Sequence, residues 1–525
     1  MNKKLAVVSL AVILSIIVTI PVLGSITDSD NIGKNSTLLN QQNWKSEWEN
    51  VKKDYEQLSI TPGRDENHVN FGWYSRTADQ AKVRISSTKD METSITFHGT
   101  SSQYKRMDGI LYYSNKVTAS FPKTDTEFYY QYYLNGNWSN ATAYKNRSKK
   151  EFDMLFVGDP QIGASIGRKA NGSSSPLTGE EAARNDSFQW KETLEDAISK
   201  YPDIRFVLSA GDQINEMVKK DTPEQDLQQE MEYAGFLAPK LLDSLPVATT
   251  IGNHDSFSAN YQNHFNNPNS YIDAATPSTA GYDYYFTYNA ALFIFLDGNN
   301  ATVKNHQEIL KKATKENPDA IWRIVTIHQD IYGYGGGHAN SDGMVLRTQL
   351  TPLFDTYDID VVLQGHDHTY MRSYPLTGDG RKHQAYDYSV DLKDPSSYRK
   401  FLEDNQCYKL VGKQKNKKAL SQNKSKGTIY VEGGSSTGSK LYASNGTEPI
   451  YVAYNNKILN PTYSIIHISP TSFKIKTYDV VTDDCIDQYA IQKGNAIEDE
   501  LNKEEKAWIK KVFSELTDYL GHIVK

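Results

Sequence analysis

Between residues 57 and 147, short runs of alternating hydrophobic and polar residues follow one another, separated by turn residues. Three of these runs, at 69–74, 81–85 and 128–133, have the period of half-buried β-strands. Several such strands in succession are typical of a small β-sandwich. The segment has no cluster of metal-ligand side chains, so we interpret it as an accessory or spacer module.

After residue 150 the pattern changes to apolar strands that alternate with amphipathic helices. This alternation predicts an α/β domain with buried strands rich in Val and Ile. The predicted strands are 152–158, 204–210, 246–251, 291–296, 322–327, 360–364 and 428–432, and the predicted helices are 186–201, 223–245, 305–317 and 344–357. Asp186 or Ser187 is the expected cap of the first helix, and 463–469 with 473–480 form a predicted closing hairpin.

The remaining segments have other compositions. Residues 25–56 are rich in Ser, Asn, Asp and Gln and predict a linker with a short helix. Residues 386–426 predict a long exposed insertion, and residues 498–525 predict an amphipathic helix that packs on the domain. The predicted division of the chain is 1–24, 25–56, 57–147, 148–480 and 481–525.

The first 24 residues have the parts of a secretory signal peptide. Lys3 and Lys4 precede an apolar run over 5–23, and Gly24-Ser25 offers small residues for cleavage. The run is also long enough for an uncleaved membrane anchor. We therefore expect a secreted, extracellular protein, with anchoring by this segment as the alternative.

Composition narrows the function further. The 525 residues suffice for two or three domains, and the 38% of hydrophobic residues can supply sizeable cores. A net charge of −7 gives no support to nucleic-acid binding as a main role. The two cysteines, Cys407 and Cys485, exclude a structural zinc site of the Cys type and leave a single disulfide open. The oligomeric state stays open.

Five predicted strands end in side chains that bind metal ions. Because ligand sites in α/β sheets gather beyond the carboxyl ends of the strands, we expect these side chains to lie together. Their oxygen and nitrogen donors suit Zn, Fe or Mn, and their number favours two ions. The side chains, in chain order, belong to Asp159, Gln161, Asp212, Asn253, His254, His328, His366 and His368.

The ordered motifs resemble those of the calcineurin-like metallophosphoesterase superfamily: Asp-x-His (here Asp-x-Gln), Gly-Asp, Gly-Asn-His-Asp, His and Gly-His-x-His. The preceding β domain, which opens near Thr61-Pro62-Gly63, resembles the fibronectin type III-like N-terminal domain of purple acid phosphatases. The resemblance covers about 57–480. It implies a four-layer α/β/β/α sandwich after a small all-β sandwich, and a phosphatase with two divalent or trivalent ions, Fe, Mn or Zn.

The resemblance also implies roles for single residues. The first ion would be bound by Asp159, Gln161 and His368, the second by Asn253, His328 and His366, and both by Asp212 as a bridge. His254 would lie beside the substrate phosphate, to stabilise charge or to protonate the leaving oxygen, and a metal-bound hydroxide would attack. His338, next to the glycine-rich loop 333–337, matches a substrate-binding histidine of purple acid phosphatases.

Two positions depart from the family pattern. Asn215 stands where purple acid phosphatases have a metal-bound tyrosine, so their colour should be absent. Gln161 stands where the superfamily usually has histidine, and its neutral, weaker donor favours Mn²⁺, Fe²⁺ or exchange of the metal. Three further acids are expected to be structural rather than ligands: Asp255, Asp297 and Asp367.

The expected reaction is hydrolysis of phosphate monoesters, with a phosphorylated small molecule or ester as substrate. A phosphodiesterase or nucleotide-type hydrolase with the same residues is the closest alternative. An alternative of another class is a cell-surface binding protein with a residual metal site.

Overall fold

The computed structural model describes residues 38–121, 127–145, 150–169, 175–220, 222–300, 302–335, 338–340, 342–381, 383, 406–411, 421–423, 427–443 and 448–493. The predicted leader 1–24, most of the predicted insertion 386–426 and the predicted helix 498–525 lie outside these residues. They stay predictions. Within the described helices, none combines the length and the apolar character that a membrane crossing requires.

The segment before residue 150 is all-β, as its alternating pattern predicts. One sheet has the order β1-β2-β6-β5 and the other the order β4-β3-β7-β8, with β9 also paired to β7. Phe71 and Trp73 of the first sheet and Val83 and Tyr130 of the second share one buried core. The strands are β1 (Ser59–Pro62), β2 (His68–Ser75), β3 (Lys82–Ser86), β4 (Ser94–His98), β5 (Thr100–Met107), β6 (Ile110–Ser120), β7 (Glu127–Leu134), β8 (Asn137–Trp138) and β9 (Thr142–Lys145).

The α/β domain contains two seven-stranded sheets. The first has the order β12-β11-β10-β23-β24-β25-β20 and the second β13-β14-β15-β16-β21-β17-β22. In the first sheet β10, β11 and β12 are parallel, and in the second β14, β15, β16 and β21 are parallel.

The strands of this domain have the following bounds: β10 (Phe152–Val157), β11 (Ile204–Ser209), β12 (Val247–Thr249), β13 (Tyr284–Tyr288), β14 (Ala291–Leu296), β15 (Trp322–Ile327), β16 (Val361–Gln364), β17 (Met371–Ser373), β18 (Leu376–Gly378), β19 (Tyr408–Leu410), β20 (Ser421–Asn423), β21 (Ile429–Glu432), β22 (Val452–Asn455), β23 (Thr462–Ile468), β24 (Ser472–Asp479) and β25 (Cys485–Gln492). The helices are α2 (Leu38–Val51), α3 (Gly179–Lys200), α4 (Pro223–Leu237), α5 (Asn260–His264), α6 (Val303–Glu316) and α7 (Asp342–Thr356), with 3-10 turns η1 (Lys240–Asp243) and η2 (His338–Asn340).

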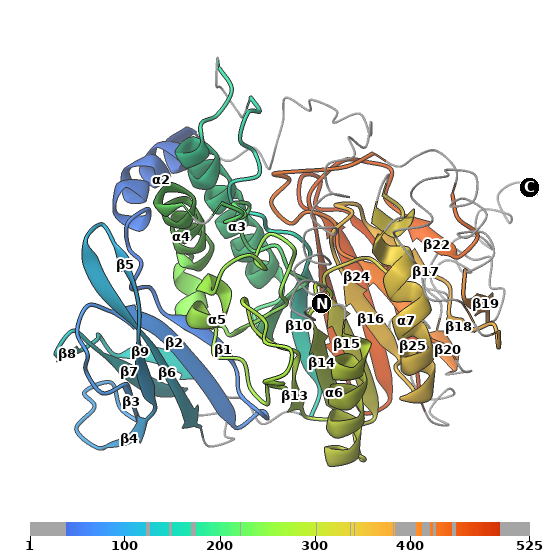
Figure 1. Ribbon diagram of the computed structural model, residues 1–525, viewed down its shortest axis with the longest axis horizontal. Helices are drawn as coiled ribbons and strands as arrows, with labels where there is room; N and C mark the ends of the chain where they lie inside the picture. Colours follow the sequence, from blue (N-terminus) through green and yellow to red (C-terminus); the bar gives the residue numbers. More distant parts are fainter. Residues whose placement is uncertain are drawn as a thin grey trace, which may run out of the picture.

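The two sheets pack face to face through one buried cluster, to which β10 contributes Phe156 and β15 contributes Ile324. Helices α2, α3 and α4 pack on the outer face of the first sheet, and α6 and α7 on that of the second. Figure 1 shows these helices on the two sides of the paired sheets. The domain therefore has four layers, α/β/β/α, which confirms the predicted fold class.

Helix α3 corrects a sequence-based prediction. It begins at Gly179, seven residues before the predicted start, because Thr178 caps it in a reciprocal capping box with Glu181. Asp186, one of the two residues predicted as its cap, is buried inside the helix instead. Its carboxylate accepts hydrogen bonds from the backbone N–H groups of Gly163 and Ser165, both at 3.0 Å. The other predicted cap, Ser187, is also inside the helix and donates to the carbonyl of Gly235 at 2.6 Å.

Other differences are smaller. The predicted helix 223–245 ends at Leu237 and is followed by the turn η1. Strands β13, β17, β18, β22 and β25 were not predicted. Strands β19 and β20 lie in the predicted exposed insertion 386–426 and pair with β18 and β25, so these two parts of it belong to sheets. Helix α2 lies in the predicted linker, and its Trp48 is buried in the core shared with α3. Neither cysteine forms a disulfide with a described residue; Cys407 is buried and Cys485 is exposed.

Candidate metal centre

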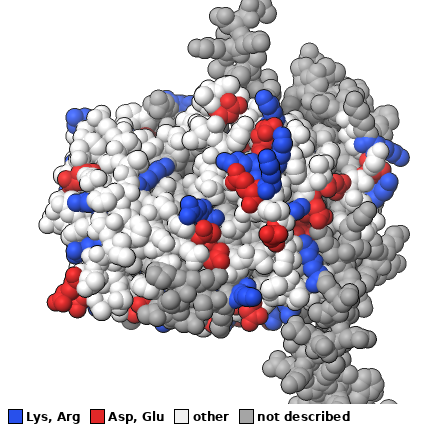
Figure 2. Space-filling model, turned by 90° about the horizontal axis from the view of Figure 1, so that it is seen from below, with Lys and Arg blue, Asp and Glu red and all other residues white. Residues whose placement is uncertain are grey.

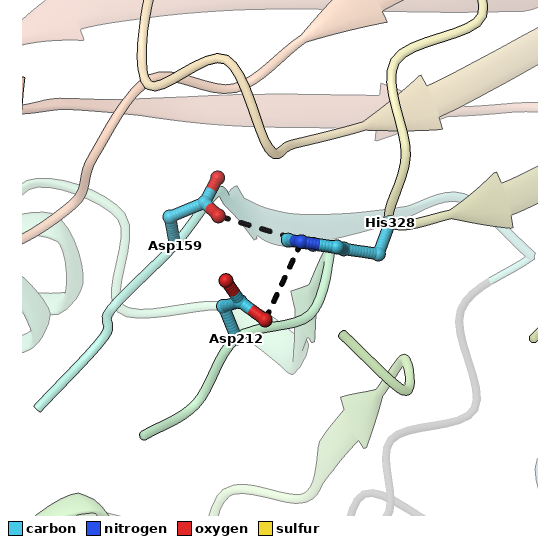
Figure 3. A group of neighbouring side chains, drawn as sticks. All are labelled: Asp159, Asp212 and His328. Atoms are coloured by element: carbon cyan, nitrogen blue, oxygen red, sulfur yellow. Dashed lines mark ion pairs between the residues drawn. The ribbon is translucent and has the colours of Figure 1, made fainter. Parts of the chain in front are cut away.

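Asp159, Asp212 and His328 converge at the ends of three strands, two of the first sheet and one of the second. Asp159 follows β10, Asp212 follows β11 and His328 follows β15, and one ligand atom from each lies within 4.8 Å of the others. His328 Nε2 is 3.4 Å from Asp212 Oδ1, and its Nδ1 is 3.8 Å from Asp159 Oδ1. All three side chains are buried. Figure 3 shows the two carboxylates pointing toward the imidazole from the first sheet.

Sharp turns position these side chains. Five of the predicted ligands have a left-handed backbone, a conformation that costs a non-glycine residue about 1–2 kcal/mol. Such strain is characteristic of functional sites, where the surrounding structure compensates for it. The φ angles are +36° at Asp159, +36° at Gln161, +48° at Asp212, +80° at His366 and +53° at His368.

Gly252 allows the Gly-Asn-His-Asp turn to approach Asp212. A Cβ atom at this position would lie 2.1 Å from Asp212 Oδ1, which no side chain tolerates. The close approach lets the backbone N–H of His254 donate to the same oxygen at 2.9 Å.

The histidine side of the centre has a defined tautomer at His328. Its Nδ1 lies 2.9 Å from the carbonyl oxygen of Ala210, which can only accept, so Nδ1 carries the proton. In the neutral imidazole, the form that can bind a metal ion, Nε2 is thereby left as an acceptor. It lies 3.0 Å from Asn253 Oδ1 and 3.1 Å from His366 Nδ1. These three atoms can all accept and lie close together. A cation placed between them would therefore bind all three.

Around Asp159 two buried oxygens lack a hydrogen-bond donor. Asp159 Oδ2 accepts from the backbone N–H of His366 at 2.9 Å, whereas Asp159 Oδ1 and Gln161 Oε1 accept from no described residue. His368 donates from Nδ1 to the carbonyl of Lys440 at 2.8 Å and has Nε2 at 3.9 Å from Asp159 Oδ1. Buried acceptors without donors are costly unless a cation compensates them. The residues present therefore fit a metal ion.

The charges point the same way. The pKa of Asp159 is raised to about 7. Burial is the main cause, the charge of His328 opposes it, and the neighbouring Asp212 adds to it. Burial would also raise the pKa of Asp212, but the charge of His328 and the hydrogen bond from the backbone N–H of His254 help to lower that pKa instead. Burial would lower the pKa of His328, and Asp212 instead raises it to about 9. In the protein alone, the imidazolium of His328 thus supplies the positive charge that the carboxylates require.

His254 borders the centre and keeps some contact with solvent, with 13% of its side chain exposed. Its Nδ1 donates to the carbonyl of Asn215, and its Nε2 lies 2.9 Å from Gln161 Nε2. Burial lowers its pKa to about 4, with the Asp212 carboxylate opposing the shift. His254 is therefore a neutral imidazole at pH 7, and its Nε2 accepts a hydrogen bond from the Gln161 amide.

The structure also places the other predicted residues. The ring of His338 lies 3.8 Å from the ring of His366, between centroids, so His338 borders the centre. Asp255 accepts from the Tyr233 hydroxyl at 2.8 Å and from Gly252 N–H at 2.9 Å. The remaining two acids bind backbone as well: Asp297 accepts from Asn299 N–H and Asp367 from His338 N–H, both at 3.1 Å.

One element of the centre was missed in the sequence. After β21 a Gly-, Ser- and Thr-rich segment, 433–439, runs beside residues 159–161. Three alternate hydroxyl groups donate to three successive carbonyls: Ser435 to Asp159 at 3.2 Å, Thr437 to Pro160 at 2.8 Å and Ser439 to Gln161 at 3.3 Å. We call Ser435, Thr437 and Ser439 the hydroxyl ladder. The signal available in the sequence was its position directly after β21. That strand runs parallel to β15 and β16, so it ends at the same edge of the second sheet.

Residues 152–370 match the family described as calcineurin-like phosphoesterase. This part of the chain is a calcineurin-like phosphoesterase domain. The family uses divalent metal ions, in agreement with the convergence of Asp159, Asp212 and His328. The match identifies the domain as that of a metal-dependent phosphoesterase. The ligand roles of the single residues stay predictions.

Similar proteins agree on the fold. The structure of a purple acid phosphatase from yellow lupin (Lupinus luteus) seeds aligns with a TM-score of 0.57 and 15% identity, over 84% of this chain and 74% of that one. Two uncharacterized proteins of Mycobacterium tuberculosis, from strains CDC 1551 and H37Rv, are each 29% identical over 157 residues. The alignment covers 25% of this chain and 29% of each relative.

Proposed function

We propose that the protein is an exported phosphohydrolase that binds two metal ions and cleaves phosphate monoesters. The observation that carries the proposal is the pair of buried, donor-free oxygens, Asp159 Oδ1 and Gln161 Oε1, beside the Asp212–His328 pair. Export is supported by the apolar leader over 5–23. Fibronectin type III character of the β-sandwich is part of the same proposal.

Seven side chains would bind the ions. Bound ions supply positive charge to the transferring phosphoryl group and activate a water for in-line attack. The donors are carboxylates, amides and imidazoles, which suit Fe, Mn or Zn. The proposed ligands are Asp159, Gln161 and His368 for one ion, Asn253, His328 and His366 for the other, and Asp212 between them.

His254 is the proton-handling group of the proposed reaction. The Asn215 carbonyl fixes the proton at Nδ1, so Nε2 faces the centre at the edge that solvent reaches. With its pKa lowered to about 4, Nε2 stays unprotonated above that pH, and the imidazolium that forms below it gives its proton readily to a leaving oxygen. His338, packed on His366, would line the opposite side of the substrate.

Asn215 changes the chemistry of the first ion. Its side-chain oxygen is 3.4 Å from Gln161 Nε2, so it orients the glutamine rather than adding a charged ligand. With a neutral residue at 215 and a neutral donor at 161, the first site carries less negative charge than one with a tyrosinate. We expect divalent Mn, Fe or Zn there and a colourless protein.

The surface gives no support to a nucleic-acid substrate. On the face in Figure 2, Lys and Arg side chains lie interspersed with Asp and Glu, without a continuous basic area. The net charge of −7 agrees with a small phosphorylated molecule as substrate.

The test is hydrolysis by the full chain reconstituted with Mn²⁺, Fe²⁺, Zn²⁺ or Co²⁺. We expect turnover of p-nitrophenyl phosphate, and a loss of about 10²–10⁴-fold in kcat in His254→Ala with metal content unchanged. His98→Ala, an exposed histidine on β4, is the matched control and should behave as the parent. Turnover of the bis ester alone would favour the phosphodiesterase, and no turnover with any ion would favour the binding protein.

A further inference from the structure

Lys440 follows the hydroxyl ladder directly. The ladder fixes residues 435–439 against 159–161, and the carbonyl of Lys440 accepts the Nδ1 proton of His368 at 2.8 Å. Its backbone is therefore tied to two of the proposed ligand-bearing segments. Any side-chain substitution at 440 leaves these backbone contacts in place.

The side chain of Lys440 lies along the same wall of the centre. Its Nζ is 5.2 Å from the centroid of the Tyr442 ring, and that ring is 4.9 Å from the ring of His368. Lys440 and Tyr442 are both half-buried. Among the described residues, no carboxylate forms an ion pair with the Lys440 ammonium, so the aromatic face is its recorded partner.

The charge of Lys440 reaches the centre. Burial lowers the pKa of His368 well below its usual value, and the Lys440 charge is the next cause in the same direction. Burial also lowers the pKa of His254, and Lys440 again adds to the effect, against Asp212. The ammonium therefore acts on a proposed ligand of the first ion and on the residue assigned to proton transfer.

We propose that Lys440 binds the second negative charge of a phosphate monoester and makes the centre select monoesters over diesters. The proposal rests on the phosphohydrolase function proposed above and names its substrate class. A monoester is a dianion above its second pKa, about 6, whereas a diester keeps one charge. A lysine ammonium that is not itself a metal ligand stabilises the dianion more than the monoanion, because the attraction grows with the charge of the substrate.

Tyr442 is a positioning residue in this arrangement. Its ring lies beside both His368 and the ammonium, so it limits the directions in which the flexible lysine can point. Lys440→Arg keeps a cation on that ring and should keep most of the selectivity, whereas Lys440→Met keeps the stem and removes the charge.

The experiment measures kcat/KM of the Mn²⁺-loaded full chain for p-nitrophenyl phosphate and for its bis ester. In Lys440→Met we expect a loss of about 10–100-fold for the monoester, the worth of one charged hydrogen bond, and less than about threefold for the diester. The difference should shrink as the pH falls below about 6, where the monoester loses its second charge. Lys312→Met is the matched control, since Lys312 Nζ lies 5.9 Å from the Tyr285 ring on the outer helix α6.

Several results would overturn the proposal. Equal losses for both esters, an unchanged ratio between them, or a ratio that does not vary with pH would each contradict a role in charge selection. If the parent protein hydrolyses neither ester, the phosphohydrolase function fails. Lys440 is then tested by calorimetric binding of inorganic phosphate to the metal-loaded protein, and unchanged affinity in Lys440→Met contradicts its role as an anion ligand.

Discussion

The two sheets contribute opposite chemistry to one centre. The first sheet delivers carboxylates and amides at the ends of β10, β11 and β12, which are Asp159, Gln161, Asp212 and Asn253. The second sheet delivers imidazoles at the ends of β15 and β16, which are His328, His366 and His368. Neither edge alone supplies both the carboxylates and the imidazoles of the proposed ligand set. The centre exists because the buried faces of the two sheets pack together.

The two edges also position each other. His328, on the second sheet, donates to the carbonyl of Ala210 on the first at 2.9 Å. Asp159, on the first, accepts from the backbone of His366 on the second at 2.9 Å. The difference between the edges is therefore one of charge and not of rigidity. In the proposed centre, the carboxylates would carry the charge that the ions neutralise, while the imidazoles would complete the coordination as neutral ligands.

Removing the charge of the central carboxylate should have the largest effect. In Asp212→Asn we expect kcat/KM to fall at least about 10³-fold and less than one ion per chain to remain after dialysis, because this residue is the proposed bridge. Metal analysis and p-nitrophenyl phosphate turnover measure both. Asp319→Asn, an exposed acid beyond α6, is the control. Full metal content in Asp212→Asn would contradict the assigned bridge.

Removing a neutral ligand from the histidine edge should cost less. We expect His328→Ala to keep one ion and to lose about 10²–10³-fold in kcat, in the range found when one group that stabilises transition-state charge is removed. Titration of the metal-free protein with Mn²⁺ should show one tight site in place of two. A loss equal to that of Asp212→Asn would mean that the two edges do not differ in the way their charges suggest.

The smallest effect, measured per pH unit, concerns stability behind the carboxylate edge. Glu232 on α4 accepts from the backbone N–H of Asn215 at 2.9 Å, and burial raises its pKa to about 8. Since the unfolded chain releases this proton near pH 4.5, the native state loses stability as the pH rises from there toward 8, by about 1.4 kcal/mol per pH unit.

Glu232→Gln should remove this one-proton contribution from the slope of unfolding free energy against pH. Urea unfolding of the metal-free protein between pH 5 and 8 measures it, at intervals of about one unit. Glu224→Gln, an exposed acid in the first turn of the same helix, should keep the parent slope. A parent-like slope in Glu232→Gln would show that Glu232 is ionised in the folded protein.

Much of this architecture could be predicted from the sequence, because local patterns of apolar and polar residues determine it. The strands 291–296 and 322–327 coincide with β14 and β15, since uninterrupted apolar runs have one favourable place in a four-layer domain. The polar residues after such strands necessarily meet at the same edge. The structure brings together every residue predicted for the centre, although their roles as ligands stay to be measured.

The rest depends on tertiary contacts. The start of α3 was missed because residues 179–185 have no apolar stripe, and the cap Thr178 gains its role only through Glu181. Strands β17 and β22 are too short for a period to show. The hydroxyl ladder looks like an ordinary turn composition, and only its contact with residues 159–161 distinguishes it.

The two segments joined by the hydroxyl ladder are synthesised at different times. Its donors follow their carbonyl partners by 276 to 278 residues, so a ribosome that adds about 5–20 residues per second reaches Ser435 roughly 14–55 s after Asp159. During that interval the turn at 159–161 lacks these three hydroxyl donors and is held only by earlier contacts, such as that of Gln161 N–H with the Asp212 carbonyl. We therefore expect this turn to gain its full set of hydrogen bonds late, after the β-sandwich and most of both sheets have been synthesised.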